Sequence, residues 1–233
     1  MQLLVSVANA SEARHAVDGG ADLIDAKDPL NGALGAVSRA TLEQIHSTVA
    51  GQRIVTAALG DASHETALEQ LTFEYGRVGV GLVKIGFAGV TDLDRVERLI
   101  AAAVRGTRAT GHACGVVAVA YADTSGMTSV DSAALVDVAA RAQATGVLLD
   151  TALKHGPGLR ELVAAPRLAA WVASAHRAGL TVALAGKLAL EDLSFVADAG
   201  ADIAGVRGAA CEAGRSSRVV AERVIALKSK MYQ

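Results

Sequence analysis

The feature that most constrains the fold is a regular alternation of two kinds of segment along the chain. Short runs rich in Val, Ile and Leu alternate with longer amphipathic segments that contain Ala, Leu and Arg, and this pattern is typical of repeated strand–helix units. Eight such runs begin about every 28 residues, which is the length that one strand, one helix and two loops require. The expected strands are residues 3–8, 22–27, 53–59, 82–87, 113–122, 146–152, 181–187 and 202–208.

Eight repeats of this size favour a closed parallel barrel over an open sheet. Single α/β barrels reach about 250 residues, so the 233 residues are expected to form one domain, a single (β/α)8 TIM barrel over residues 1–233. An open sheet that binds a dinucleotide carries a GxGxxG turn after its first strand. The turn here reads Val7-Ala8-Asn9-Ala10-Ser11 and disfavours that alternative. Ser11, Ser38 and Asp92 are the expected N-caps of three of the helices.

Composition excludes several classes of protein. A hydrophobic content of 52% with a net charge of −2 excludes a disordered chain. The longest apolar stretch, residues 116–122, is far shorter than the roughly 18 residues of a membrane-spanning helix. The first residues lack the basic region of a signal peptide, and the charge balance gives no support to a nucleic-acid partner. We therefore expect a cytoplasmic protein without a membrane or nucleic-acid partner, and the sequence leaves open whether it forms a homo-oligomer.

The lysines are few and unusually placed. The chain has sixteen Arg and six Lys, and two of the lysines lie in its last six residues. The other four lie at or just after the carboxyl ends of expected strands two, four, six and seven: Lys27, Lys84, Lys154 and Lys187. Active sites of (β/α)8 barrels lie at that face. A desolvated lysine can lose its proton and form a Schiff base with a carbonyl, which arginine cannot do. The pattern indicates amine chemistry, with ordinary solvated loop lysines as the alternative.

Two aspartates accompany these lysines. Asp25 precedes Lys27 by two residues and Asp150 precedes Lys154 by four, so each pair shares one side of its strand. Inward residues of alternate strands fall in a common layer of a barrel. The predicted site therefore combines Asp25, Lys27, Lys84, Asp150 and Lys154. Which lysine is neutral at pH 7 stays open, as does the alternative of a structural ion-pair network that plugs the barrel.

A second expected site binds anions. Barrels often bind phosphate in the loops after strands seven and eight, and small residues there let the anion approach the backbone. The candidate residues are Gly186, Lys187, Arg207, Gly208 and Ala209, followed by Gly214-Arg215-Ser216. Glycine after a strand is also ordinary turn chemistry. The loop after strand two, residues 28–35, is either a rigid loop that faces substrate or a structural crossover.

No metal or redox site is expected. Cys114 and Cys211 are far apart, and the sequence has no CxxC, HxH or HExxH motif. The residues alone thus point to carbon–carbon bond formation or cleavage on a small phosphorylated carbonyl compound, through a Schiff base.

Several motifs resemble those of one enzyme family. Asp25-Ala26-Lys27-Asp28-Pro29 with Gly32-Ala33-Leu34-Gly35 is similar to the (5-formylfuran-3-yl)methyl phosphate synthases, also called 4-(hydroxymethyl)-2-furancarboxaldehyde-phosphate (4-HFC-P) synthases. The resemblance extends to Val83-Lys84-Ile85-Gly86, Leu149-Asp150-Thr151, Ala185-Gly186-Lys187-Leu188 and Gly205-Val206-Arg207-Gly208-Ala209.

This resemblance implies a lyase that joins two molecules of glyceraldehyde 3-phosphate into a phosphorylated furan aldehyde, releasing phosphate and water. The step belongs to the biosynthesis of methanofuran or a related furan cofactor and needs no metal or organic cofactor. The resemblance also implies that Lys27 forms the Schiff base and that Lys84 accepts a proton. The alternatives are another Schiff-base aldolase, in which Lys154 would be the nucleophile, a sugar-phosphate isomerase, and a barrel that binds a ligand without turnover.

Overall fold

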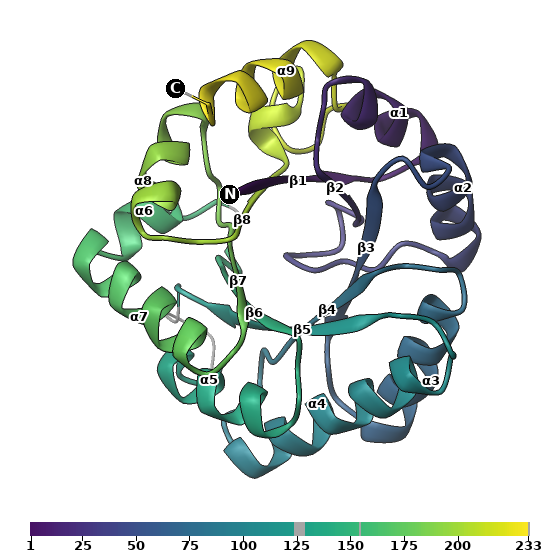
Figure 1. Cartoon of the computed structure of the whole chain (residues 1–233), viewed down its shortest axis with the longest axis vertical. Coiled ribbons are helices and arrows are strands. Elements are labelled where there is room, and N and C mark those ends of the chain that lie inside the picture. The colour runs from purple at the N-terminus through teal and green to yellow at the C-terminus, as the bar shows by residue number, and fades with distance from the viewer. Residues whose placement is uncertain (124–128, 154, 233) are drawn as a thin grey trace.

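The computed structural model describes residues 1–123, 129–153 and 155–232. Within them a closed barrel of parallel strands runs in the order β1 to β8, with β8 paired to β1, and the helices surround it (Figure 1). The strands are β1 (Gln2–Val7), β2 (Leu23–Ala26), β3 (Ile54–Asp61), β4 (Leu82–Gly86), β5 (Gly115–Tyr121), β6 (Gly146–Asp150), β7 (Thr181–Leu184) and β8 (Ile203–Val206). The predicted (β/α)8 barrel and its eight strands are confirmed.

The helices occupy the connections between the strands. They are α1 (Ala10–Asp18), α2 (Arg39–Val49), α3 (Glu65–Gly76), α4 (Leu93–Arg108), α5 (Ser132–Arg141), α6 (Leu159–Leu162), α7 (Ala165–Arg177), α8 (Leu193–Asp198) and α9 (Ala221–Lys230). Two short 3₁₀ helices, η1 (Leu190–Asp192) and η2 (Gly208–Ala210), follow β7 and β8.

Most strands end earlier than the sequence pattern indicates. β7 ends at Leu184 rather than at residue 187, and β6 ends at Asp150 rather than at residue 152. Small and polar residues at these positions have left the sheet ladder and form the rim of the barrel. The rim residues are therefore the ones available to a ligand.

Local capping follows the sequence at two of the three expected positions. Ser38 accepts the N–H of Thr41, and Asp92 caps α4. The expectation for Ser11 was wrong, because Asn9 caps α1 by accepting the N–H of Glu12. Asn is among the strongest N-cap residues, and here it begins the helix two residues earlier.

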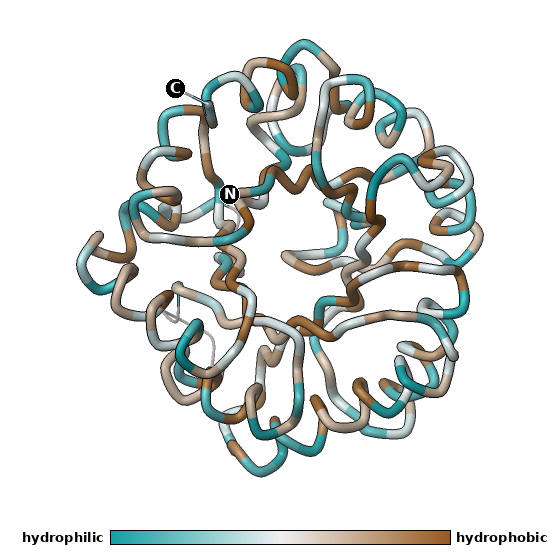
Figure 2. Tube along the Cα trace, viewed as in Figure 1, coloured by the Kyte–Doolittle hydropathy of each residue, from teal (hydrophilic) through white to brown (hydrophobic). Residues whose placement is uncertain are grey.

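Two apolar layers hold the barrel together. The larger layer lies between the strands and the helices, and a smaller one fills the barrel interior with side chains such as Leu4, Val119, Leu148 and Ile203. Figure 2 shows the corresponding hydrophobic ring on the strands. Because both faces of each strand are buried, the strands read in the sequence as nearly continuous apolar runs.

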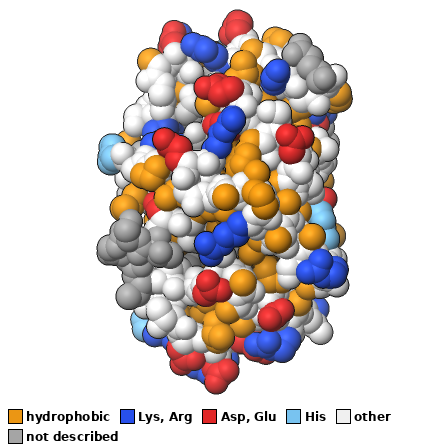
Figure 3. All heavy atoms as spheres, turned by 90° about the vertical axis from the view of Figure 1, so that its left-hand side faces the viewer, with side chains coloured by type: hydrophobic (Ala, Val, Ile, Leu, Met, Phe, Trp, Pro, Cys, Tyr) orange, Lys and Arg blue, Asp and Glu red, His pale blue; other side chains and the backbone are white. Residues whose placement is uncertain are grey.

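The surface carries mixed charge. Acidic and basic side chains are interspersed over the face that Figure 3 shows, and elsewhere on the surface exposed pairs such as Arg39 with Glu43 neutralise each other. No helix within the described ranges combines the length and the apolarity that crossing a membrane requires.

Helices α3 and α4 pack closely because α4 has a glycine at their contact. A Cβ on Gly106 would overlap the carbonyl oxygen of Glu69 and the hydroxyl of Thr72, both on α3. The absence of a side chain therefore sets the distance between these two helices.

We predict that Gly106→Ala lowers the free energy of unfolding by about 1–3 kcal/mol, the usual cost of overpacking, although Ala favours helix. Urea denaturation measures this. The control is Gly76→Ala at the end of α3, where the added Cβ would meet a side chain, Cγ2 of Thr110 at 2.8 Å, and no backbone atom. An equal loss for both variants would contradict the backbone overlap as the cause.

Candidate active site

A cavity of about 520 Å³ opens at the carboxyl ends of the strands. Its volume is in the range of small-molecule sites. Apolar side chains of the barrel interior, among them Leu4, Leu148 and Ile203, form its floor. Its wall includes these predicted site residues: Lys27, Lys84, Asp150, Gly186, Lys187, Arg207, Gly208 and Ala209. Lys154 is outside the described residues.

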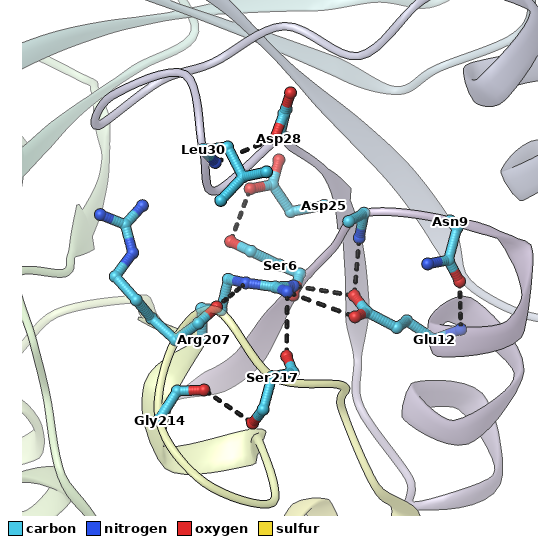
Figure 4. A network of polar contacts seen from close by, with 11 residues as sticks. Ser6, Asn9, Glu12, Asp25, Asp28, Leu30, Arg207, Gly214 and Ser217 are labelled. Atoms are coloured by element: carbon cyan, nitrogen blue, oxygen red, sulfur yellow. Dashed lines mark hydrogen bonds and ion pairs between the residues drawn. The ribbon is translucent and has the colours of Figure 1, made fainter.

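Asp25 lies at the base of this site and is fully buried, with 0% of its surface exposed. Its Oδ2 accepts the hydroxyl of Ser6 at 2.8 Å and lies 2.6 Å from Nζ of Lys84, and its Oδ1 accepts the hydroxyl of Thr56 at 2.8 Å. Figure 4 shows the contact with Ser6. Four adjacent strands, β1 to β4, thus fix one carboxylate and orient Lys84 beside it.

Register explains why these groups meet. Ser6 is the ladder partner of Asp25 on β1, and Thr56 is its partner on β3. All three side chains point into the barrel, and both hydroxyls reach the Asp25 carboxylate. Sequence reasoning found Asp25 and Lys84 but missed the two hydroxyls, because Ser and Thr are common in strands and loops. The signal that finds them is strand register.

Lys27 directly follows β2, and only 8% of it is exposed. Its backbone N–H donates to the carbonyl of Val7 at 2.9 Å. The next residue, Asp28, accepts the N–H of Leu30 and the side-chain amide of Asn31, and its own N–H donates to Gly35. The loop at residues 28–35 is therefore folded on itself, which holds the Lys27 backbone in place.

Asp150 ends β6 and is buried, and its Oδ1 accepts the N–H of Thr151 at 2.7 Å. The loop that follows is fixed by a carboxylate that the sequence analysis did not find. Asp123, after β5, accepts the N–H groups of Ala152 and Leu153 at 2.6 Å each. Asp123 thus positions the segment that leads to Lys154.

The backbone after β7 turns sharply at Gly186 and Lys187, two of the residues predicted to bind an anion. Gly186 has a φ of +108°, and Lys187 has a φ of +57°, so the backbone turns in the left-handed region at two successive residues. Nζ of Lys187 donates to the carbonyl of Gly156. The N–H groups of Gly208 and Ala209, after β8, have no acceptor among the described residues.

Arg207 is committed to other groups of the protein. Its Nη1 donates to Glu12 at 2.8 Å and to the Ser6 carbonyl at 2.9 Å, and its Nη2 donates to Glu12 at 3.2 Å and to the Ser217 carbonyl at 3.3 Å. Its Nε donates to the carbonyl of Arg215 at 2.7 Å. Figure 4 shows this arrangement. The guanidinium is a buried brace between α1, β1 and the loop after η2, and a direct phosphate contact from Arg207 stays a prediction.

The cysteines lie apart from this chemistry. Burial raises the pKa of the Cys114 thiol to about 11 and also raises the pKa of Cys211, so neither is an activated nucleophile. In the described part of the chain no cluster of His, Cys, Asp and Glu could hold a metal ion.

The fold is a (β/α)8 barrel, and lysines and buried aspartates lie at its carboxyl face, where enzymes of this fold have their active sites. The model of the 4-HFC-P synthase family matches residues 3–228. The chain therefore belongs to the 4-HFC-P synthase family, and the family expected from the motifs is confirmed.

Relatives support the same assignment. The (5-formylfuran-3-yl)methyl phosphate synthase of Methanopyrus kandleri is 39% identical over 218 residues, covering 93% of this chain and 92% of the relative. The enzyme of that name from Methanocaldococcus jannaschii is 34% identical over 231 residues, covering 98% of each. The crystal structure of a 3-hexulose-6-phosphate synthase aligns with a TM-score of 0.66 at 22% identity, over 99% of this chain and 100% of that one. That last likeness concerns the fold alone.

We predict that Asp25→Ala lowers the free energy of unfolding by about 3–5 kcal/mol, because the buried ammonium of Lys84 loses its partner. Chemical denaturation provides the measurement. The control is Glu65→Ala, which breaks the exposed pair with Arg98 and should cost at most about 1 kcal/mol. A loss for Asp25→Ala no larger than the control's would show that the buried pair does not support the fold.

Proposed function

We propose that the protein condenses two molecules of glyceraldehyde 3-phosphate into (5-formylfuran-3-yl)methyl phosphate, releasing phosphate and water, through a Schiff base on Lys27. The observation that carries this proposal is the cavity that Lys27, Lys84 and Asp150 line together, with the buried Asp25 carboxylate 2.6 Å from Nζ of Lys84. The family match supports the product, since the relatives carry the name of that synthase. The cofactor served is methanofuran or a related furan.

The nucleophilic role of Lys27 is supported by the resemblance of the motif at residues 25–29 to the 4-HFC-P synthase family, which the family match strengthens. Lys27 lines the cavity at the rim, one residue beyond its strand. Its amine can reach a carbonyl held in the cavity. Lys84, whose Nζ lies 2.6 Å from the carboxylate of Asp25, is placed to move a proton with that carboxylate.

The reaction then follows from the amine and the carboxylates. The nitrogen of Lys27 adds to the aldehyde carbon of one triose phosphate and water leaves, which gives an imine. The Lys84–Asp25 pair removes the proton from the neighbouring carbon, and the resulting enamine expels phosphate from the third carbon. The second triose phosphate isomerises so that its carbonyl lies on the second carbon, and the third carbon of the first triose adds to it. Cyclisation with loss of two waters gives the furan ring, and hydrolysis of the imine releases the aldehyde and restores the amine of Lys27. Asp150 assists proton transfer on the opposite wall.

At least one substrate phosphate binds at the rim after β7 and β8. Lys187 supplies charge, the left-handed turn at Gly186 lets an anion approach the backbone, and the N–H groups of Gly208 and Ala209 point to the same rim as donors. Arg207 supports this rim from behind through its contact with Glu12. Lys154 has a predicted role in holding phosphate.

The test is incubation of the protein with glyceraldehyde 3-phosphate, with detection of the furan chromophore in the ultraviolet. Interconversion of sugar phosphates without a furan would favour an aldolase or isomerase instead. Binding of substrate without turnover would favour a non-catalytic barrel.

We predict that Lys27→Ala lowers kcat/KM by at least about 10³-fold and abolishes covalent labelling by substrate and borohydride, because no Schiff base can form. The control is Lys230→Ala, an exposed lysine on α9, which should keep wild-type rate and labelling. Peptide mapping of the labelled wild-type protein is the decisive measurement: a labelled peptide that contains Lys84 or Lys154 in place of Lys27 would reassign the nucleophile.

A further inference from the structure

Arg215 is a cation of the cavity that the reaction above does not use. It lies in the loop at residues 211–219, between η2 and α9, and it lines the cavity together with Lys187. Arg207 holds this loop from below by donating to the carbonyls of Arg215 and Ser217. The backbone of Arg215 is therefore fixed, although the loop has no regular secondary structure.

Further contacts close the loop on itself. Cys211 and Val219 form an antiparallel bridge, and the N–H of Glu212 donates to the carbonyl of Arg218 at 3.0 Å. The hydroxyl of Ser217 donates to Gly214 at 2.8 Å, as Figure 4 shows. These contacts fix the position of the Arg215 backbone, from which its side chain extends.

The side chain of Arg215 reaches across the mouth of the barrel. Its Nη2 donates to the carbonyl of Gly32 at 3.2 Å, in the loop that follows Lys27. It is half-buried, and burial lowers its pKa while the Asp150 carboxylate opposes that shift. The guanidinium thus bridges the loops after β8 and β2 and interacts electrostatically with the carboxylate of Asp150 on β6.

The donors of Arg215 are largely unused. A guanidinium has five N–H donors, and Arg215 makes one hydrogen bond among the described residues. Arg207 spends its donors on Glu12 and three carbonyls, and the exposed Arg218 in the same loop pairs with Glu212 at 3.0 Å. Partly desolvated donors without partners are costly, so a guanidinium held this way beside a cavity is suited to an anion that enters it.

We propose that Arg215 binds one of the two substrate phosphates and thereby selects phosphorylated over unphosphorylated aldehydes. This proposal rests on the proposed function, whose reaction brings two phosphate groups to one cavity. The rim after β7 and β8 offers charge and backbone donors for one of them. Arg215, reaching toward the Lys27 loop, supplies a planar fork of donors for the other.

The experiment compares wild type, Arg215→Gln and Arg215→Lys, with Arg218→Gln as the matched control from the same loop. Steady-state rates are measured with glyceraldehyde 3-phosphate, and borohydride labelling of Lys27 is measured with that substrate and with glyceraldehyde. We expect Arg215→Gln to raise the KM for the phosphorylated substrate about 10- to 100-fold, the range for losing hydrogen bonds to a charged group. Labelling by glyceraldehyde should not change, and Arg215→Lys should restore part of the loss because it keeps the charge without the fork.

Calorimetry with inorganic phosphate separates this proposal from the proposed function. Wild type and Arg218→Gln should bind phosphate alike, and Arg215→Gln should bind at least about tenfold more weakly. That result supports the proposal even if glyceraldehyde 3-phosphate yields no furan. Unchanged phosphate affinity in both Arg215 variants would overturn it, as would an equal loss of labelling with phosphorylated and unphosphorylated aldehydes.

Discussion

The site depends on the hydrogen bonds and the ion pair that the buried carboxylate of Asp25 forms with its neighbours. The carboxylate receives two hydroxyls and one ammonium, and these groups come from three other strands. A charge in so dry a place is tolerated only when its partners are fixed. The barrel fixes these partners, because Ser6 and Thr56 are the ladder partners of Asp25 on the two neighbouring strands. The same geometry that satisfies Asp25 sets the position of Lys84 relative to Lys27.

The interior of the barrel and its rim differ in chemistry: the interior is apolar, and the rim carries charged and polar groups. The interior is apolar below Asp25 and gives a dry floor. The rim is built from loops whose backbones are held by hydrogen bonds to charged side chains. Asp28 holds the loop after β2, Asp123 the loop after β6, and Arg207 the loop after β8. In each case one buried or half-buried charged side chain fixes the backbone of a loop at the carboxyl face of the barrel.

The sequence predicts the barrel well because the strands are buried on both faces, which leaves a strong apolar signal every repeat. It predicts Lys27, Lys84 and Asp150 because strand ends locate the active face of such a barrel. It does not reveal Ser6 or Thr56, whose roles come from register, nor Asp123, whose partners are backbone groups 29 and 30 residues away. It also cannot tell Arg207 from Arg215, since Arg207 pairs with Glu12 in the first helix and Arg215 reaches the carbonyl of Gly32 after β2.

The brace between Glu12 and Arg207 joins residues 195 positions apart. Glu12 belongs to the first helix and Arg207 directly follows the last strand, so this ion pair links the two ends of the barrel where β8 pairs with β1. A ribosome that has released only the first seven strands has made Lys27, Lys84 and Asp150 but no partner for Glu12. Because β1 pairs with β8 and Glu12 pairs with Arg207, the barrel closes only after the eighth strand has been made.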